Sequence, residues 1–583
     1  MKEVFLDSWR LMAPYWRSEE RKKAWGLLSG VIVTVITGIY FQVLLNEWSR
    51  VTFDAFQNYN TKLFISQWKL FALYLIGFLL VFMLQVYFKN KLIIAWRRWM
   101  TNSLLSKWLE KKAYYKMSLY DCTSDNPDQR LSQDVGEFVT LTETVFINSI
   151  DKFLTLITFS VLLWSLSSTF SIPECIPVVG GKVIPGLLFW ITISYSLLNT
   201  YISFRFGKTI VSLMFNKEKF EANFRYSLMR IRENTESIAL YQGERAEKKA
   251  SMSFYQSIIK NMYKTMYWNI RYFLWTSFIL NISSQVPFLL AAPFYFSKKI
   301  LFGGVIQIAN AISHVQNSIL HFMQILPTLA DLRASNKRLV GFINDLECIQ
   351  KKDLSTSHIK HIIKPQTNIV HAKLKSVLLP TDKVLVGNVD ITFSQGESIL
   401  LAGPSGSGKS TFLRVLSGIW PFGQGAVQMP DFKDILFVPQ RPYIPLGTLR
   451  DILLYPSHSS QRARKKRQDN HLKELMIKVG LSDFIEELDK NCEWSKRLSL
   501  GEQQKISFCR ILLHKPKWVF LDEATSSLDE LAEKELYKLI TQEIKGITIV
   551  SIAHRSTLKP FHHRCIYFNT TGMSTVLEDR PLV

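Results

Sequence analysis

The first half of the chain alternates long apolar segments with polar, largely basic connections. A helix needs about 20 apolar residues to cross the hydrocarbon core of a bilayer. Ala24 to Leu45, the first apolar segment, carries no charged side chain. The segments that fit this pattern cover residues 24–45, 69–88, 150–170, 184–204, 272–296 and 300–327. We therefore predict a membrane domain of six spanning helices over residues 1–340.

The two long polar connections, residues 89–149 and 205–271, exceed the usual length of a loop. The stretch WRRWMTNSLLSKWLEKKAYY in the first of them is amphipathic at helical spacing. We expect the spanning helices to continue through these connections beyond the membrane.

The pattern changes after Pro327, where charged residues become frequent. Residues 341–369 show no clear period, which is typical of a linker. From about Val370, β-rich runs such as ILFVPQ, KWVFLDE and GITIVSIAH alternate with helical patterns. This order is typical of an α/β domain built on a mononucleotide-binding sheet. The sequence therefore predicts a second, soluble domain over residues 370–583.

The chain is basic, with 71 Lys and Arg against 48 Asp and Glu and a net charge of +23. Nine basic residues lie within 89–149 and thirteen within 205–271, against two within 46–68 and one within 171–183. Because loops rich in Lys and Arg stay on the cytoplasmic side, both termini are expected in the cytoplasm. Membrane orientation thus accounts for much of the charge, and we expect no nucleic acid partner. The six cysteines form no CxxC pair, which argues against a zinc site or a disulfide framework.

A glycine-rich motif, GPSGSGKS, follows the apolar run SILLA and precedes the helical pattern TFLRVLSG. This is the context of a phosphate-binding loop, whose backbone N–H groups and following helix N-terminus cradle phosphates. In such a loop Lys409 reaches the β- and γ-phosphates, and the Ser410 hydroxyl ligates Mg²⁺. The residues expected to bind nucleotide here are Gly403, Pro404, Ser405, Gly406, Ser407, Gly408, Lys409, Ser410 and Thr411.

Two carboxylates end the apolar strand pattern WVFLDEA. The carboxyl end of a strand beside a phosphate loop is where such groups meet Mg²⁺ and the attacking water. We expect Asp522 to hold Mg²⁺ through water. Glu523 is expected to act as the general base that orients and polarises the attacking water.

The stretch LSLGEQQ stands shortly before that acidic strand end. Ser499 and Gly501 lie where the helical pattern GEQQKISFCRILL begins, and the positive N-terminus of a helix favours a phosphate. Together with the phosphate loop, FVPQ, FLDEATSSLD and SIAHR, this stretch resembles an ATP-binding cassette (ABC) ATPase over residues 374–556.

The resemblance implies ATP and Mg²⁺ as ligands, and a role for each matching residue. In ABC ATPases two cassettes face head to tail, and each ATP is closed by the LSLGEQQ stretch of the other subunit. The closing residues expected here are Ser499, Gly501 and Gln503. Gln440 is expected to sense Mg²⁺ and the attacking water, and His554 to contact the γ-phosphate. Asp529 is expected to act across the interface of a homodimer.

The cassette departs from the family pattern at the adenine site. ABC cassettes usually stack adenine on an aromatic side chain upstream of the phosphate loop, and residues 376–386 (SVLLPTDKVLV) contain none. We expect aliphatic groups near Leu378 and Pro380 to hold the base, so selectivity for adenine stays open.

Four segments outside the catalytic motifs narrow the resemblance: WRRWMT, DNPDQRLSQD, EANFRYSLMRIRENTESIALYQGE and RPYIPLGTLRDILLYP. They are similar to segments of subfamily D transporters and of bacterial permease-ATPases fused to an SbmA/BacA-like membrane domain. The resemblance implies an exporter-like fold whose six spans cross over between two half-transporters, followed by an α/β P-loop cassette. It also implies that segments around DNPDQR and EANFRYSLMR contact the cassettes.

The sixth apolar segment carries a polar stripe with spacings of three and four residues, which places its members on one helix face. The stripe consists of Gln307, Asn310, His314, Asn317, His321 and Gln324. Lipid is a poor neighbour for these groups, so they are expected to line a substrate path or a dimer seam. Hydrogen bonding between helices is the alternative. Whether the two histidines respond to pH stays open.

These observations predict a homodimeric half-transporter that uses ATP to move a hydrophilic solute, such as cobalamin or peptides, across a lipid bilayer. Fatty acyl-CoA is the alternative cargo, since subfamily D members are associated with it. An ATP-gated channel or regulator, and a soluble ABC ATPase acting on nucleic acid, are the other classes, and the apolar spans oppose the latter. A bacterial inner membrane is the expected location, with an organelle membrane as the alternative.

Overall fold

A computed structural model describes residues 2–120, 126–167, 185–352, 359–365, 367–456, 465–571 and 574–581. The chain forms two compact units. The first contains Met1–Lys107 and Thr123–Asn344, and the second contains Trp108–Cys122 and Asp345–Val583. The predicted division into a membrane domain and a cassette therefore needs one change, because the short segment Trp108–Cys122 belongs with the second unit.

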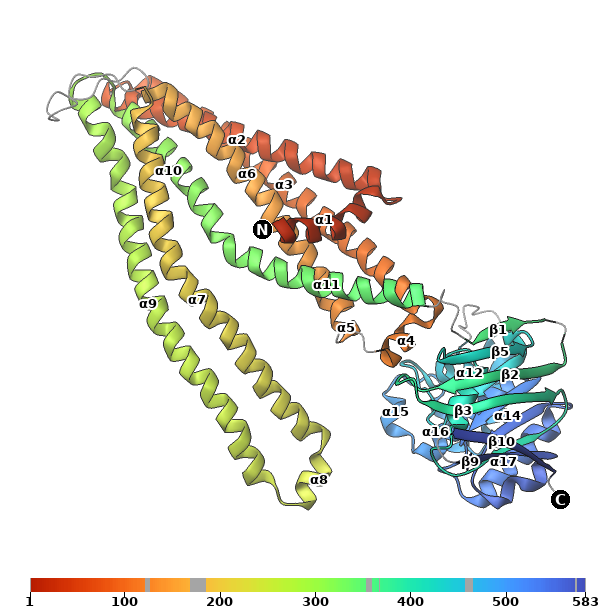
Figure 1. Cartoon of the computed structure of the whole chain (residues 1–583). Helices are drawn as coiled ribbons and strands as arrows, with labels where there is room; N and C mark the ends of the chain where they lie inside the picture. Colours follow the sequence, from red (N-terminus) through yellow and green to blue (C-terminus); the bar gives the residue numbers. More distant parts are fainter. Residues whose placement is uncertain are drawn as a thin grey trace. The chain divides into compact units, whose positions relative to one another are not determined.

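The first unit is helical (Figure 1). Its long helices are α1 (Lys2–Arg17), α2 (Arg21–Gln57), α3 (Thr61–Leu109), α6 (Val135–Ser167), α7 (Leu187–Glu233), α9 (Glu244–Phe296), α10 (Phe302–Gln324) and α11 (Leu326–Lys352). Short elements are α5 (Pro127–Gln129), a π-helical turn (Arg130–Asp134) and α8 (Thr235–Leu240). The predicted spans 24–45, 69–88 and 272–296 lie in α2, α3 and α9, and the described parts of 150–170 and 184–204 lie mainly in α6 and α7. The predicted span 300–327 covers α10 and the start of α11, with a break at Ile325. Helices α3, α7 and α9 continue well past the apolar segments, as expected.

Helix α10 lies at the centre of the contacts in this unit, since it packs against α2, α6, α7 and α9. Helices α7 and α9 run side by side along their length and are joined through α8 (Figure 1). The apolar core around α10 contains Phe159, Leu163, Phe294, Ile308 and Ile312, all nearly inaccessible to solvent.

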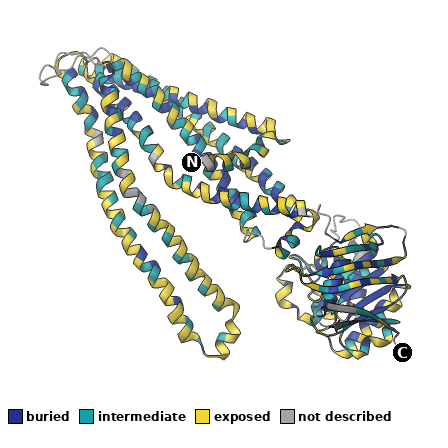
Figure 2. Cartoon of the chain, in the orientation of Figure 1, coloured by how far each residue is buried: buried dark blue, intermediate teal, exposed yellow. Residues whose placement is uncertain are grey.

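Among the described residues, three helical stretches are by themselves long and apolar enough to cross a membrane: Arg21–Gln57, Thr61–Leu119 and Pro127–Ser167. Leu187–Ile202 and Gln285–Phe296 are shorter apolar helices. Helix α10 falls short because its stripe of amides and imidazoles lowers its mean hydropathy. Figure 2 shows many exposed positions on these helices, and on α3 they include Leu79, Phe82 and Met83. Such apolar surface is suited to contact with lipid.

The structure differs from the predicted linker over residues 341–369. Helix α11 continues to Lys352, and strand β1 (Lys360–Ile363) pairs with β5 (Gly423–Met429). Leu339, Phe342 and Leu346 are buried at spacings of three and four residues, a helical period that the frequent charged side chains between them obscure. Residues 353–358 of the predicted linker lie outside the described residues.

The second unit is built on a ten-stranded sheet with the order β1-β5-β2-β3-β10-β9-β4-β8-β7-β6. The remaining strands are β2 (Ile369–Leu378), β3 (Val384–Ser394), β4 (Ile399–Ala402), β6 (Ile435–Val438), β7 (Trp518–Asp522), β8 (Thr548–Ile552), β9 (Arg564–Thr571) and β10 (Ser574–Pro581). Strands β9, β4, β8, β7 and β6 are mutually parallel. This arrangement confirms the predicted α/β cassette.

Helices pack on this sheet and complete two apolar cores. They are α12 (Lys409–Leu416), α13 (Leu449–Leu454), α14 (Lys465–Lys478), α15 (Trp494–Arg497), α16 (Leu500–His514) and α17 (Glu530–Glu543). The short 3-10 turns are Glu110–Lys112, Phe432–Asp434, Ser482–Glu487 and Ser556–Phe561. Strands β4, β7 and β8 are largely buried, whereas β1 and β3 expose many of their residues. The first half of RARKKR, the basic run at 462–467, lies outside the described residues.

The segment Trp108–Cys122 contains α4 (Ala113–Leu119), which packs within the second unit. Leu119 lies against the core that contains Phe412 and Val377. The rings of Tyr120 and Phe422 meet edge to face with centroids 5.1 Å apart. A contact of this kind was expected around DNPDQR, and the structure places it in the residues just before that motif.

Candidate functional site

The predicted nucleotide residues gather at one edge of the sheet because they follow the ends of neighbouring parallel strands. Gly403 follows β4, Glu523 follows β7, and Gln440 and His554 come two residues after β6 and β8. The strand ends are in register, with Leu401 and Asp522 both opposite Ile552. The carboxyl edge of a parallel sheet is the usual place for a ligand, and the chain topology alone brings these residues together.

The phosphate loop has the backbone that its glycines require. Gly403, Gly406 and Gly408 have φ values of +146°, +79° and +94°. A Cβ at Gly403 would lie 2.7 Å from the carbonyl oxygen of Phe568, so glycine is needed there for space as well as for conformation. Lys409 Nζ donates to the carbonyl oxygens of Gly403 at 2.9 Å and Pro404 at 2.7 Å. Burial lowers the pKa of Lys409, whereas Glu523 and Asp522 raise it.

Ser410 and Asp522 form the part of the site that fits a divalent cation. Ser410 Oγ donates to Asp522 Oδ1 at 2.8 Å. Burial raises the pKa of Asp522, while the hydrogen bond from Ser410 lowers it. Mg²⁺ prefers oxygen ligands and is usually held by one or two protein groups together with phosphates and water. A hydroxyl and a half-buried carboxylate side by side suit that mode. Among the described residues no cluster of three or more His, Cys, Asp and Glu side chains offers an all-protein metal site.

The Glu523 carboxylate lies between two further predicted side chains. Gln440 Nε2 donates to Glu523 Oε2 at 2.9 Å, and His554 Nε2 lies 3.2 Å from Glu523 Oε1. Glu523 has a φ of +47°, an uncommon conformation for a residue with a side chain. Its backbone N–H donates to Ile552 O at 3.1 Å, which holds the residue after β7 against the end of the neighbouring strand β8.

The stretch LSLGEQQ forms the start of α16, as its pattern predicts. Ser499 is the N-cap of this helix and forms a capping box with Glu502. Its backbone N–H and hydroxyl lie 2.8 and 2.9 Å from Glu502 Oε2. Gln503 donates to the carbonyl oxygens of Ser495 and Leu498, so its side chain holds the preceding turn.

Sequence reasoning missed Gln504, the residue that joins the predicted segments. Its Nε2 lies 3.1 Å from Ser526 Oγ, and its Oε1 accepts from Ser527 N at 3.0 Å. The same amide reaches the carbonyl oxygen of Gln440 at 3.4 Å. The side chain is buried, and its position in LSLGEQQ was the available signal.

The loop that carries Asp529 is fixed by a buried carboxylate that sequence reasoning also missed. Glu533, 2% exposed, accepts hydrogen bonds from Thr525 at 2.5 Å and Thr557 at 2.9 Å. Arg555 donates to Leu528 O at 2.6 Å and lies 3.8 Å from Glu533. Asp529 is the N-cap residue of α17 and makes no capping hydrogen bond with its side chain.

The adenine region is a turn between β2 and β3, closed by a hydrogen bond from Leu379 N to Lys383 O at 2.9 Å. Leu385 lies close to the phosphate loop, because a Cβ at Gly408 would be 3.0 Å from its Cγ. The apolar side chain that borders the loop from this hairpin is therefore aliphatic.

The structure divides the polar stripe of α10 into two parts. Gln307 Nε2 donates to Glu47 Oε2 at 2.8 Å and Asn310 Nδ2 to Ser49 Oγ at 3.3 Å, so both serve the contact with α2. The His314 ring stacks on Phe159 of α6 with centroids 4.0 Å apart. These three residues thus make contacts between helices, which is the alternative that the sequence leaves open, and their place along a substrate path stays a prediction.

The other end of the stripe borders a cavity. Asn317 and Gln324 line it together with residues of α7 and α9. His321, the remaining member, has its Nε2 shielded from solvent and without a hydrogen-bond partner among the described residues.

Two family models match the chain: "ABC transporter transmembrane region 2" over residues 11–296 and "ABC transporter" over residues 386–526. An uncharacterized ABC transporter ATP-binding protein of Haemophilus influenzae is 32% identical over 94% of this chain and 89% of its own length. The lysosomal cobalamin transporter ABCD4 of Homo sapiens is 27% identical over 81% of this chain and 80% of its own length.

A solved structure of a bacterial Atm1-family ABC exporter with ATP bound has the same fold. It gives a TM-score of 0.68 at 16% identity and covers 95% of this chain and 94% of that one. One assignment follows from the order of helical region and cassette, from the residues at the nucleotide site and from these relatives. The chain belongs to the ABC transporter family, as a subfamily D-like half-transporter with a helical transmembrane region followed by an ABC cassette.

Proposed function

We propose that this protein hydrolyses ATP to move a hydrophilic solute across a membrane, and that it works as a homodimer. The observation that carries the proposal is the Glu523 carboxylate, which contacts both Gln440 and His554 beside the Ser410–Asp522 pair. These are the groups needed to position a water, take its proton and neutralise phosphate charge.

Each residue of the nucleotide site has its own role in hydrolysis. Asp522 and Ser410 would hold Mg²⁺, which would supply positive charge close to the phosphates. When ATP binds, the Lys409 ammonium gives up its hydrogen bonds to the carbonyl oxygens of Gly403 and Pro404 and binds phosphate oxygens instead. Glu523 accepts the proton of the attacking water, Gln440 orients the water and Mg²⁺, and His554 donates to a γ-phosphate oxygen.

The homodimer supplies the second half of the site. The Ser499 and Gly501 end of α16 is the positive terminus of a 15-residue helix, which favours an anion. We infer that this terminus in one cassette closes on the ATP held by the phosphate loop of the partner. Gln503 supports that stretch from behind, and Asp529 acts across the same interface.

The expected cargo is a hydrophilic solute. Cobalamin is favoured because the human relative is a lysosomal cobalamin transporter, and peptides remain the other hydrophilic cargo. Fatty acyl-CoA is the less favoured cargo because its phosphates need cations, and the cavity beside α10 is lined by uncharged side chains. A bacterial inner membrane is the proposed location.

The test is ATP-dependent uptake of labelled cobalamin into proteoliposomes with outward-facing cassettes. Glu523→Gln is expected to abolish accumulation while the protein still binds ATP. Glu535→Gln, an exposed carboxylate of α17, serves as the matched control and is expected to accumulate solute as the parent does. Equal accumulation by Glu523→Gln and the parent would contradict the assigned base. Vigorous hydrolysis by the parent without uptake of cobalamin or peptides would contradict the cargo class or the direction of transport.

A further inference from the structure

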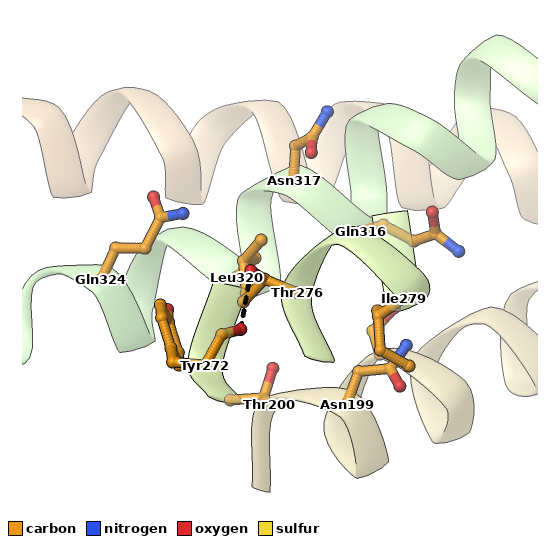
Figure 3. Close-up of a pocket in the computed structure, with 10 residues that line it drawn as sticks. Asn199, Thr200, Tyr272, Thr276, Ile279, Gln316, Asn317, Leu320 and Gln324 are labelled. Atoms are coloured by element: carbon orange, nitrogen blue, oxygen red, sulfur yellow. Dashed lines mark hydrogen bonds between the residues drawn. The ribbon is translucent and has the colours of Figure 1, made fainter. Parts of the chain in front are cut away.

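A cavity of about 270 Å³ lies between α7, α9 and α10 of the helical unit (Figure 3). Its lining contains no Asp, Glu, Lys, Arg or His. The groups that matter for recognition are Asn199 and Thr200 of α7, Tyr272 of α9, and Gln316, Asn317 and Gln324 of α10. These side chains provide five uncharged hydrogen-bonding groups together with the aromatic ring of Tyr272.

These polar groups have hydrogen-bonding capacity to spare. In the described part of the chain, the side chains of Asn199, Thr200, Gln316, Asn317 and Gln324 make no hydrogen bond to another protein group. The Gln316 Nε2 atom is shielded from solvent and still lacks a partner. A shielded amide without a partner carries a free-energy cost of about 1–3 kcal/mol, so something other than this protein is expected to satisfy it.

Several other polar side chains on these helices have partners within the protein. Two hydroxyls that also line the cavity are used within their own helices: Ser196 Oγ donates to Thr192 O at 2.7 Å and Thr276 Oγ1 to Tyr272 O at 2.9 Å. Further along α10, Gln307 and Asn310 are paired with α2. The amides of Asn199, Gln316, Asn317 and Gln324 differ from these groups, because they have no protein partner in the described part of the chain.

The cavity lies toward one end of the predicted spans. Asn199 and Thr200 are near the end of the span 184–204, Tyr272 begins the span 272–296, and Gln324 is near the end of the span 300–327. By the distribution of basic residues these ends face the cytoplasm. A solute on the cytoplasmic side would meet this cavity first.

We propose that this cavity is a recognition site for an uncharged amide-bearing part of the transported solute. Amides of Asn and Gln donate and accept at once, so they pair with the amides of a ligand, and the Tyr272 ring offers a flat face. The volume is slightly below the range of about 300–1,000 Å³ for pockets that hold a whole drug-sized ligand. It therefore takes one group of a larger solute, and a charged group is excluded by the absence of a counterion.

The inference rests on the proposed transport function. Its test measures binding at the cavity, so it can fail even if the protein transports the solute. Equilibrium binding of labelled cobalamin, whose ring carries several carboxamides, is measured on the purified full-length protein in lipid nanodiscs without ATP. Asn199→Leu combined with Gln316→Leu is expected to raise the Kd about tenfold, as for the loss of two ordinary hydrogen bonds. Gln256→Leu, an exposed glutamine of α9 outside the cavity, is the matched control and is expected to bind as the parent does.

Cobalamin with one carboxamide hydrolysed to a carboxylate serves as the charged probe. When the hydrolysed carboxamide is one that enters the cavity, this probe is expected to bind the parent about tenfold more weakly than cobalamin does. An unchanged Kd in the double variant, or equal binding of the charged probe, would overturn the inference even if the parent transports cobalamin. If the parent binds no amide-bearing solute and binds acyl-CoA, both the cavity assignment and the cargo class are overturned. Should the double variant fail to fold, Asn317→Leu and Gln324→Leu, at exposed positions of α10, test the same site.

Discussion

The contact between α4 and the cassette gives the sharpest prediction about how hydrolysis is linked to transport. Leu119 packs on the cassette core, and Tyr120 meets Phe422 edge to face at 5.1 Å. Lys112 Nζ adds a long contact of 3.4 Å to Ser417 O, which contributes little. The segment stands between α3 and the DNPDQR motif in the sequence, and we expect it to transmit movement of the cassette to the helical unit.

The variant Leu119→Ala with Tyr120→Ala removes the apolar part of this contact. An edge-to-face ring pair contributes about 0.5–1.5 kcal/mol beyond its burial, and a partly buried leucine adds about 1 kcal/mol, less than the value for full burial. A total of about 2 kcal/mol corresponds to a loss of roughly 30-fold in the docking equilibrium of the segment. None of the residues at the nucleotide site is touched.

The assay compares ATP hydrolysis with solute uptake in the same proteoliposomes. We expect uptake per ATP hydrolysed to fall by about tenfold or more, in line with the docking loss, while basal hydrolysis is retained. Ser118→Ala is the control, because its exposed hydroxyl bonds only to Tyr115 O within the same helix. Unchanged uptake in the double variant would refute a role of this segment in coupling. A parallel fall in hydrolysis and uptake, together with earlier thermal unfolding, would show that the contact only stabilises the cassette.

Three further predictions concern the nucleotide site. Glu523→Gln is expected to lower kcat for ATP by about 10²–10⁴-fold with little change in nucleotide affinity, because the water loses its base; steady-state hydrolysis and equilibrium binding check this. Burial raises the pKa of Asp522, so the folded state binds its proton more tightly than the unfolded state and stability is lost as pH rises through the folded pKa. Asp522→Asn is therefore expected to raise the Tm of the nucleotide-free protein at neutral pH, with the gain vanishing below the ordinary Asp pKa; a gain of equal size at both pH values would contradict this. Because base stacking on an aromatic ring is worth about 1–3 kcal/mol, its absence predicts that GTP is hydrolysed with a kcat/KM close to that for ATP, and a preference for ATP above about a hundredfold would argue against an aliphatic adenine site.

The convergence of several candidate nucleotide residues could be predicted from the sequence, and the reason is topological. The phosphate loop, Gln440, Glu523 and His554 each follow a β-rich run, and the ends of parallel strands meet at one edge of a sheet. Gln440, Glu523 and His554 therefore converge although they are far apart in the chain. Gln504 and Glu533 escaped prediction because their roles depend on partners that no spacing rule reveals.

The helical unit was less predictable, because helical spacing fixes which residues share a face but not what lies opposite. The period in residues 341–352 was hidden by charged side chains, so the continuation of α11 was taken for a linker. The association of α4 with the cassette depends on contacts such as that between Tyr120 and Phe422, which are some 300 residues apart in the chain. Long-range packing of this kind leaves no local signal.

The polar stripe of α10 shows what helical spacing predicts and what only the hydrogen-bond partners reveal. Its residues share one face, as the spacing predicts, yet they have different roles because the neighbouring helices differ along the stripe. Gln307 and Asn310 meet partners on α2, whereas Asn317 and Gln324 face a cavity and have none among the described residues. A polar group in an apolar region must be satisfied either by protein or by a ligand or water. Accounting for each hydrogen bond thus separates residues that hold helices together from residues available to a solute, and the sequence pattern alone cannot make that separation.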